Sequence, residues 1–276
     1  MTGQERPKVL LKAVLEATLH LPTKDMAYPG KQPHLQARPI EDLPLPDLSQ
    51  TSEELLRKQL EEETIRALAS QVIFTCLGAL KSHSIFAYLH SLRVAWFAEA
   101  VYQEVLNLPP NVGFVTGACH DWGKIRCPAS ILDKPGLVDG REYDKIKEHP
   151  YFSFVILEGR GYPLLARIVL GHHSPQPRGY PPRYNESNPF LRETQRLLAL
   201  ADWFAAKQEE RPEHGEREVI RRMVHTPNQT ELAHLDASET EVKILQTADM
   251  DLALSGGINL SVMMETARRK LRGEPP

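Results

Sequence analysis

Apolar residues recur every three or four positions along most of the chain, which is the spacing that gathers them on one face of an α-helix. Between residues 51 and 70, Leu56 and Leu60 lie one turn apart on such a face, and Thr51 or Ser52 is a candidate N-cap. No segment alternates apolar and polar residues over a length useful for a β-strand. The chain is therefore predicted to be all-α. The expected helices span 8–20, 51–70, 84–107, 111–120, 139–149, 151–158, 163–172, 187–208, 238–253 and 258–271.

Prolines divide the helical pattern. Residues 21–50 contain six prolines and no sustained period, and because proline lacks an N–H donor and blocks helix we expect an extended connector there. Two further proline-rich loops are expected at 125–138 and 174–189. The predicted organisation is an N-terminal helix with a proline-rich connector over 1–50, followed by one helical domain over 51–276.

Composition and charge narrow the class of protein. The chain has 276 residues, 41% hydrophobic and 25% charged, as in ordinary soluble globular proteins. Its formal net charge of −3 provides no global basic field, so nucleic acid is not an expected partner. The longest apolar run, VIFTCLGAL (72–80), is too short to cross a bilayer. Three cysteines without CxxC spacing suit a reducing compartment, and we expect a cytoplasmic location.

Several histidines and acids occupy positions that the helical pattern assigns to the interior. His90 shares a stripe with Val94, Asp202 shares one with Leu198, and His172 ends an apolar helix. The residues with this placement, or at the ends of the same helices, are His90, His120, Asp121, His149, His172, His173 and Asp202.

Any one of these residues alone is best explained as a core histidine or a hydrogen-bonded buried acid. An inward-facing carboxylate, however, costs several kcal/mol unless it is paired or bound to a metal. Together, five imidazoles and two carboxylates suit one or two divalent transition ions such as Mn, Fe or Zn. Cys119 and Cys127 are interpreted as core residues. No role is assigned to His20, His34, His83, His225 and His234.

The order of these residues resembles the HD superfamily of metal-dependent phosphohydrolases, specifically its HD-GYP branch. The resemblance covers residues 84–214 and implies an HD-domain helical bundle. The helical pattern outside this range adds an N-terminal helical or extended extension and a helical tail over 238–271. The segments that carry it are HSLRVA (90–95), HDWGKIRCPASILDKPGLVDGREYDKIKEHP (120–150), HH (172–173), GYP (179–181) and ADWFAA with the following RP (201–212).

The resemblance implies a site with two divalent metal ions, Fe or Mn foremost, with Zn or Ni as alternatives. Asp121 would bridge the ions. The other ligands would be His90, His120 and Asp202 for one ion, and His149, His172 and His173 for the other.

The same resemblance implies the chemistry. Members of the family hydrolyse cyclic di-GMP to the linear dinucleotide pGpG or to GMP, by attack of a metal-bridging hydroxide on phosphorus. Lys124 would stabilise charge at the scissile phosphate and Arg211 would bind a substrate phosphate. Gly179, Tyr180 and Pro181 would belong to the substrate loop.

Three positions depart from the family pattern. Phe86 replaces a glutamate that supports a third metal in some members, so two metals are expected. Ser174 replaces the glutamate of HHE, and His214 replaces a basic phosphate-binding residue. The metal ligands are thus all present, whereas the substrate loop is altered.

Alternative functions remain open. The same metals could serve a nucleotide phosphohydrolase or a nuclease with a different pocket, or the domain could be degenerate and bind a nucleotide or a partner without catalysis. The expected partner is a phosphodiester or nucleotide small molecule. Helices within 51–80 and 238–271 could support a homodimer or contact a regulatory protein.

Overall fold

The computed structural model describes residues 43, 45–134, 137–176, 179–182, 184–208 and 232–254, without the side chains of 250–254. All regular secondary structure in these ranges is helical, which confirms the all-α prediction. The predicted helices at 8–20 and 258–271, most of the connector, Arg211 and His214 lie outside the described residues. The elements are α2 (Glu53–Ala69), α3 (Val72–His83), α4 (Ile85–Glu104), α5 (Val112–Cys119), η2 (Trp122–Arg126), α6 (Ala129–Leu132), α7 (Gly140–Ile146), α8 (His149–Glu158), α9 (Pro163–Leu170), α10 (Pro189–Gln208), η3 (Ala233–Leu235) and α13 (Glu239–Leu254).

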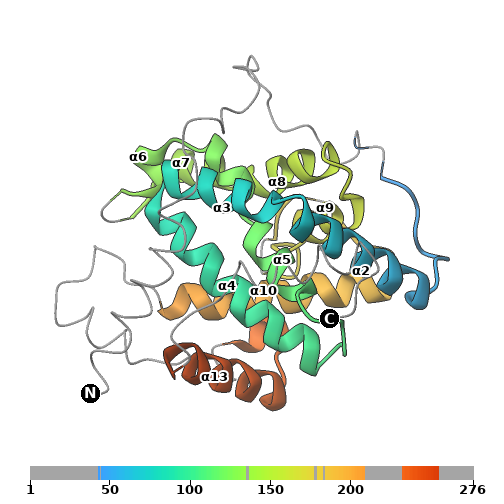
Figure 1. Ribbon diagram of the computed structural model, residues 1–276. Coiled ribbons are helices and arrows are strands. Elements are labelled where there is room, and N and C mark those ends of the chain that lie inside the picture. Colours follow the sequence, from blue (N-terminus) through green and yellow to red (C-terminus); the bar gives the residue numbers. More distant parts are fainter. Residues whose placement is uncertain are drawn as a thin grey trace.

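Helix α4 is the central element. It crosses the molecule from upper left to lower right in Figure 1 and contacts α3, α5, α10 and α13, the last along the lower edge. Its buried face includes Phe97 and Tyr102. The ring of Phe97 packs edge-on against the ring of Phe204 in α10, with the two ring centroids 5.0 Å apart. One continuous apolar core thus joins helices that are distant in sequence.

Glycines allow α5 to lie directly against α4. A Cβ at Gly113 would come within 2.4 Å of the carbonyl oxygen of Ala98, and one at Gly117 within 2.6 Å of the Cα of Ala95. Only glycine permits so close an approach of two backbones. The contact brings the C-terminal end of α5 beside the N-terminal half of α4, where His90 lies.

The apolar stripes predict most helices well. The 51–70 helix is α2, with Ser52 as its N-cap, and VIFTCLGAL lies within the largely buried α3. The predicted helix 139–149 is wrong in one respect, because it ends at Ile146 and a new helix begins at His149 with Pro150 in its first turn. The helix predicted over 163–172 ends earlier, at Leu170, because the N–H of Gly171 turns back to the carbonyl of Ile168.

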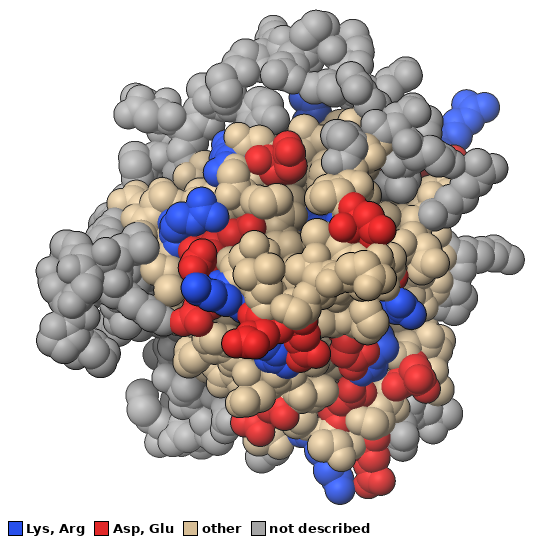
Figure 2. Space-filling view, turned by 90° about the vertical axis from the view of Figure 1, so that its right-hand side faces the viewer, with Lys and Arg blue, Asp and Glu red and all other residues tan. Residues whose placement is uncertain are grey.

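Surface charges are mixed. Figure 2 shows acidic and basic side chains intermingled over one face of the molecule. Several form ion pairs, such as Arg57 with Glu53 and Arg196 with Glu193, each at 2.6 Å. Among the described residues, no helix combines the length and the hydropathy that a bilayer crossing requires.

Candidate metal centre

The structure brings all seven predicted ligand residues into the interior, and each is buried. They belong to five segments that lie far apart along the chain. His90 comes from α4, His120 and Asp121 from the turn after α5, His149 from the first turn of α8, His172 and His173 from the turn after α9, and Asp202 from α10.

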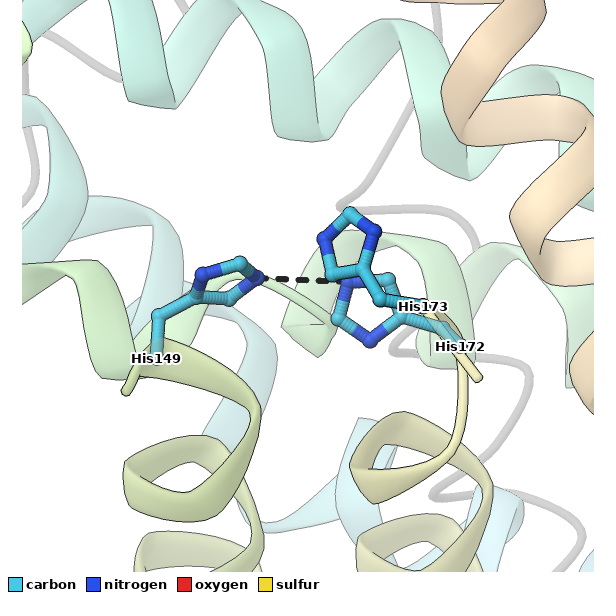
Figure 3. A group of neighbouring side chains, drawn as sticks. All are labelled: His149, His172 and His173. Carbon is cyan, nitrogen blue, oxygen red and sulfur yellow. Dashed lines mark hydrogen bonds between the residues drawn. The ribbon is translucent and has the colours of Figure 1, made fainter. Parts of the chain in front are cut away.

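The first group of ligand atoms belongs to His149, His172 and His173, and these atoms lie within 4.8 Å of one another. His149 reaches across from the start of α8 toward the two histidines that follow α9 (Figure 3). Its Nε2 is 3.3 Å from Nε2 of His172, and the rings of His172 and His173 are 4.0 Å apart. Three imidazoles thus converge on one point.

The second group consists of His90, His120 and Asp202, again within 4.8 Å. Oδ1 of Asp202 is 2.9 Å from Nε2 of His90 and 3.9 Å from Nε2 of His120. The buried carboxylate of α10 therefore faces two imidazoles, one from α4 and one from the turn after α5.

Asp121 lies between the two groups. Its Oδ1 is 3.0 Å from Nε2 of His149, whereas its Oδ2 is 3.3 Å from Nε2 of His120 and 3.6 Å from Nε2 of His90. Each oxygen of one carboxylate thus faces a different cluster of imidazoles. That arrangement suits a carboxylate shared by two ions.

Backbone carbonyls orient three of the histidines in the same way. Nδ1 of His120, His149 and His172 is 2.6–2.7 Å from the carbonyl three residues earlier in each case. A hydrogen on Nδ1 donates to that carbonyl and leaves the lone pair of Nε2 directed into the centre. The local turn geometry therefore presents these rings as ligands.

Unsatisfied atoms and electrostatics both fit a divalent metal. Within the described residues, Nε2 of His120, Nδ1 of His173 and Oδ1 of Asp121 are buried without a hydrogen-bond partner. Such atoms are costly unless something binds them. Burial lowers the pKa of His172 to about 4, so the ring is neutral near pH 7, which is the form that coordinates a metal.

The carboxylates are held in their ionised form. Burial would raise the pKa of Asp121, but the imidazole of His120 and the ammonium of Lys124 outweigh it and hold that pKa well below its usual range. Asp202 is likewise lowered, with burial outweighed mainly by His90. Ionised carboxylates and imidazoles together form a donor set typical of Mn, Fe or Zn.

Lys124 and Gly123 complete the turn after Asp121. Nζ of Lys124 is 2.5 Å from Oδ2 of Asp121. A Cβ at Gly123 would come within 2.1 Å of the carbonyl oxygen of His149, and the Gly123 N–H donates to Oγ of Ser153 at 2.7 Å. Glycine therefore lets this turn rest on the first turn of α8, which brings Asp121 within reach of His149.

Residues 87–207 match the HD domain family model. This segment is therefore similar to an HD domain. It contains all seven residues of the buried centre.

Three relatives show what this segment is similar to. One is a "Cyclic di-GMP phosphodiesterase" from Thermotoga maritima, 33% identical over 129 residues, which are 45% of this chain and 34% of the relative. Another is a "3'3'-cGAMP-specific phosphodiesterase 1" from Vibrio cholerae, 30% identical over 155 residues, 54% of this chain and 36% of the relative. A third, "Cyclic di-GMP phosphodiesterase PA4108" from Pseudomonas aeruginosa, is 29% identical over 156 residues, 53% and 37% of the two chains. The matched region thus spans about a third of each relative.

The GYP segment (179–181) lies against the first histidine group. The ring of Tyr180 stacks on His173 with centroids 4.3 Å apart, and the segment turns so tightly that a Cβ at Gly179 would come within 2.4 Å of the carbonyl oxygen of Ser174. Pro181 follows and is partly buried.

One residue near the site was missed by sequence reasoning. Tyr143 of α7 stands edge-on to Tyr180 with centroids 6.4 Å apart, and 43% of it is exposed. Nζ of Lys147 lies over its ring at 4.6 Å. The signal in the sequence is an aromatic residue within the otherwise charged helix GREYDKI.

Proposed function

We propose that the protein is a metal-dependent phosphodiesterase that hydrolyses a cyclic dinucleotide, such as cyclic di-GMP, to the linear dinucleotide or to GMP. The observation that carries the proposal is the placement of Asp121, whose two oxygens face two separate histidine groups at 3.0–3.6 Å. The relatives support the substrate class, because each is named as a cyclic di-GMP or 3'3'-cGAMP phosphodiesterase.

The centre would hold two divalent ions with Asp121 shared between them. When bound, such ions polarise a phosphoryl oxygen and provide a nucleophile from water at neutral pH. Fe or Mn is proposed foremost, with Zn or Ni as alternatives, because nitrogen and oxygen ligands accept all four. The proposed sets are His90, His120 and Asp202 for one ion, and His149, His172 and His173 for the other.

Lys124 is proposed to stabilise the charge that develops on the phosphate. Its ammonium contacts Asp121, and its side chain keeps partial solvent exposure, at 19%. It therefore stands at the boundary between the buried carboxylate and an approaching substrate. A preformed positive charge in a poorly hydrated site stabilises a transition state more than the same charge in water.

The substrate side of the site is proposed to include Gly179, Tyr180 and Pro181, with Tyr143 beside them. Burial raises the pKa of Tyr180, so its phenol stays neutral and its ring can pack against His173. The exposed ring of Tyr143 offers a flat surface on which a nucleobase could stack. Arg211 is proposed to bind a second phosphate of the substrate.

The test of the proposal compares wild-type protein with Asp121→Ala. We expect about two ions per wild-type chain by elemental analysis, and turnover of cyclic di-GMP or 3'3'-cGAMP with added Mn or Fe. Asp121→Ala should lose both metal and turnover, because both ligand groups lose their shared carboxylate.

Asp144→Ala is the matched control, since its side chain is 72% exposed and pairs with Lys147 on the surface. It should leave metal and turnover unchanged. Full metal content and full turnover in Asp121→Ala would refute the shared carboxylate. Two ions in the wild type with no cyclic dinucleotide hydrolysed would refute the substrate class and leave the metal centre in place.

A further inference from the structure

Helices α5 and α9 have the same length and the same position relative to the predicted ligands. Each has eight residues, and each leads at its C-terminal end into a pair of predicted ligands. Neither has a side-chain cap of its own, because Asn111 and Tyr162 at the two N-cap positions make no capping hydrogen bond. The first N–H groups of a helix need partners from elsewhere.

A glutamate from another helix supplies those partners in both cases. Glu63 of α2 is buried and accepts from the N–H groups of Leu164 at 3.1 Å and Leu165 at 3.0 Å, in the first turn of α9. Each oxygen takes one hydrogen bond. A carboxylate at this position also interacts favourably with the positive end of the helix dipole.

Glu99 of α4 does the same for α5. It accepts from the N–H of Asn111 at 2.6 Å and from the N–H of Phe114 at 2.9 Å. The side chain of Gln103 donates a further hydrogen bond to it, which fixes its orientation.

The chain of contacts continues from each cap to the centre. The ring of His172 donates to the carbonyl of Val169 in α9, and the ring of His120 donates to the carbonyl of Gly117 in α5. A helix of eight residues is about 12 Å long and moves as one stiff unit. A displacement of its capped end is therefore passed to the imidazole at its other end.

We infer that Glu63 and Glu99 are positioning residues of the metal centre, which set the placement of the ligands after α9 and α5 by capping those helices from a distance. The inference rests on the proposed function only in that it takes these histidines as metal ligands.

The inference extends the centre beyond the segment that is similar to an HD domain. Glu63 precedes the matched segment 87–207 and lies 101 positions before Leu164. Two more contacts join α2 to the start of α9, from Arg66 to the carbonyl of Gly161 at 3.3 Å and between the hydroxyls of Ser70 and Tyr162 at 2.8 Å. Helix α2 is thus the support on which α9 is placed.

The test measures metal binding by Glu63→Gln and Glu99→Gln in the full chain. Glutamine keeps the shape but turns an NH₂ group toward a backbone N–H. In Glu63→Gln, one ion per chain should bind about 10-fold more weakly, as for other residues that orient ligands, while the other ion binds normally. In Glu99→Gln both ions should weaken, because His120 and the shared Asp121 follow α5. The readouts are chelator competition and the visible spectrum of the Co(II)-loaded protein.

Glu62→Gln is the control, since Glu62 is exposed on the same helix and should have no effect. If Glu63→Gln does not fold, Glu63→Asp keeps the charge but withdraws the oxygens by one methylene, and should weaken the same single ion. Unchanged affinities and Co(II) spectrum in folded variants would overturn the inference. Equally weakened binding of both ions in the Glu63 variant, in proportion to its loss of stability, would also overturn it. A wild-type chain that binds no ion would do the same. Two ions bound without any turnover would refute the proposed activity alone.

Discussion

Lys124 differs from the seven buried ligand candidates because it brings a positive charge to the edge of the centre. Its Nζ lies 2.5 Å from Oδ2 of Asp121, yet the side chain is not fully buried. A lysine there can neutralise part of the carboxylate charge and still meet a substrate phosphate. Replacing Lys124 should therefore impair catalysis without impairing metal binding.

Lys124→Ala should keep both ions and reduce kcat by about 100-fold, the loss typical of removing one group that stabilises transition-state charge. Metal content by elemental analysis and steady-state kinetics on the same preparation measure the two effects. Lys243→Ala, an exposed lysine on α13, should change neither. Loss of metal in Lys124→Ala would mean that the lysine supports Asp121 instead of the substrate.

At the scale of elements, the contact between η2 and α8 decides how far His149 stands from Asp121. Gly123 makes this contact, since its position leaves no room for a Cβ against the carbonyl of His149. The requirement could not be derived from the sequence, which shows a glycine but not what it touches. The sequence predicted a boundary between two helices here but placed it at residue 150, whereas α7 ends at Ile146 and α8 begins at His149.

Gly123→Ala should therefore push α8 away from the turn. We expect an unfolding free energy lower by about 1–3 kcal/mol, as for other overpacked sites, and weaker binding of the ion held by the His149 group. Gly140→Ala is the control, because a Cβ there meets nothing within 4 Å. Urea denaturation with parallel metal analysis measures both. Equal stability of the two variants would contradict the steric argument.

For the whole molecule, the sequence predicted the helical class and the ligand candidates because both depend on local spacing. His90 and Asp202 stood out as polar residues on apolar stripes, and the structure buries both. Contacts over long separations gave no such signal. Glu63 is one of three consecutive glutamates in the sequence, and nothing in that run indicates that its carboxylate caps a helix 101 positions away.

Stability of the whole metal-free protein should depend on pH between about 4 and 6.5. Burial lowers the pKa of His172 from 6.5 to about 4, and lowers those of His149 and His173 as well. Between these values the unfolded chain binds protons that the folded chain does not, so stability is full above pH 6.5 and falls as the pH drops toward 4. Urea midpoints of chelator-treated protein measure this. His172→Gln should show a flatter profile, and a flat profile in the wild type would contradict the burial argument.

The five origins of the ligands also have a consequence for folding. His90 and Asp202 are 112 positions apart and meet at 2.9 Å only when α4 and α10 have packed together. An unfolded chain cannot assemble this centre, so an ion that binds here binds the native state alone. Such an ion raises the free energy of unfolding by mass action, about 2.7 kcal/mol when its free concentration is 100 times its Kd. The thermal unfolding midpoint of the protein then rises with the concentration of free metal around it.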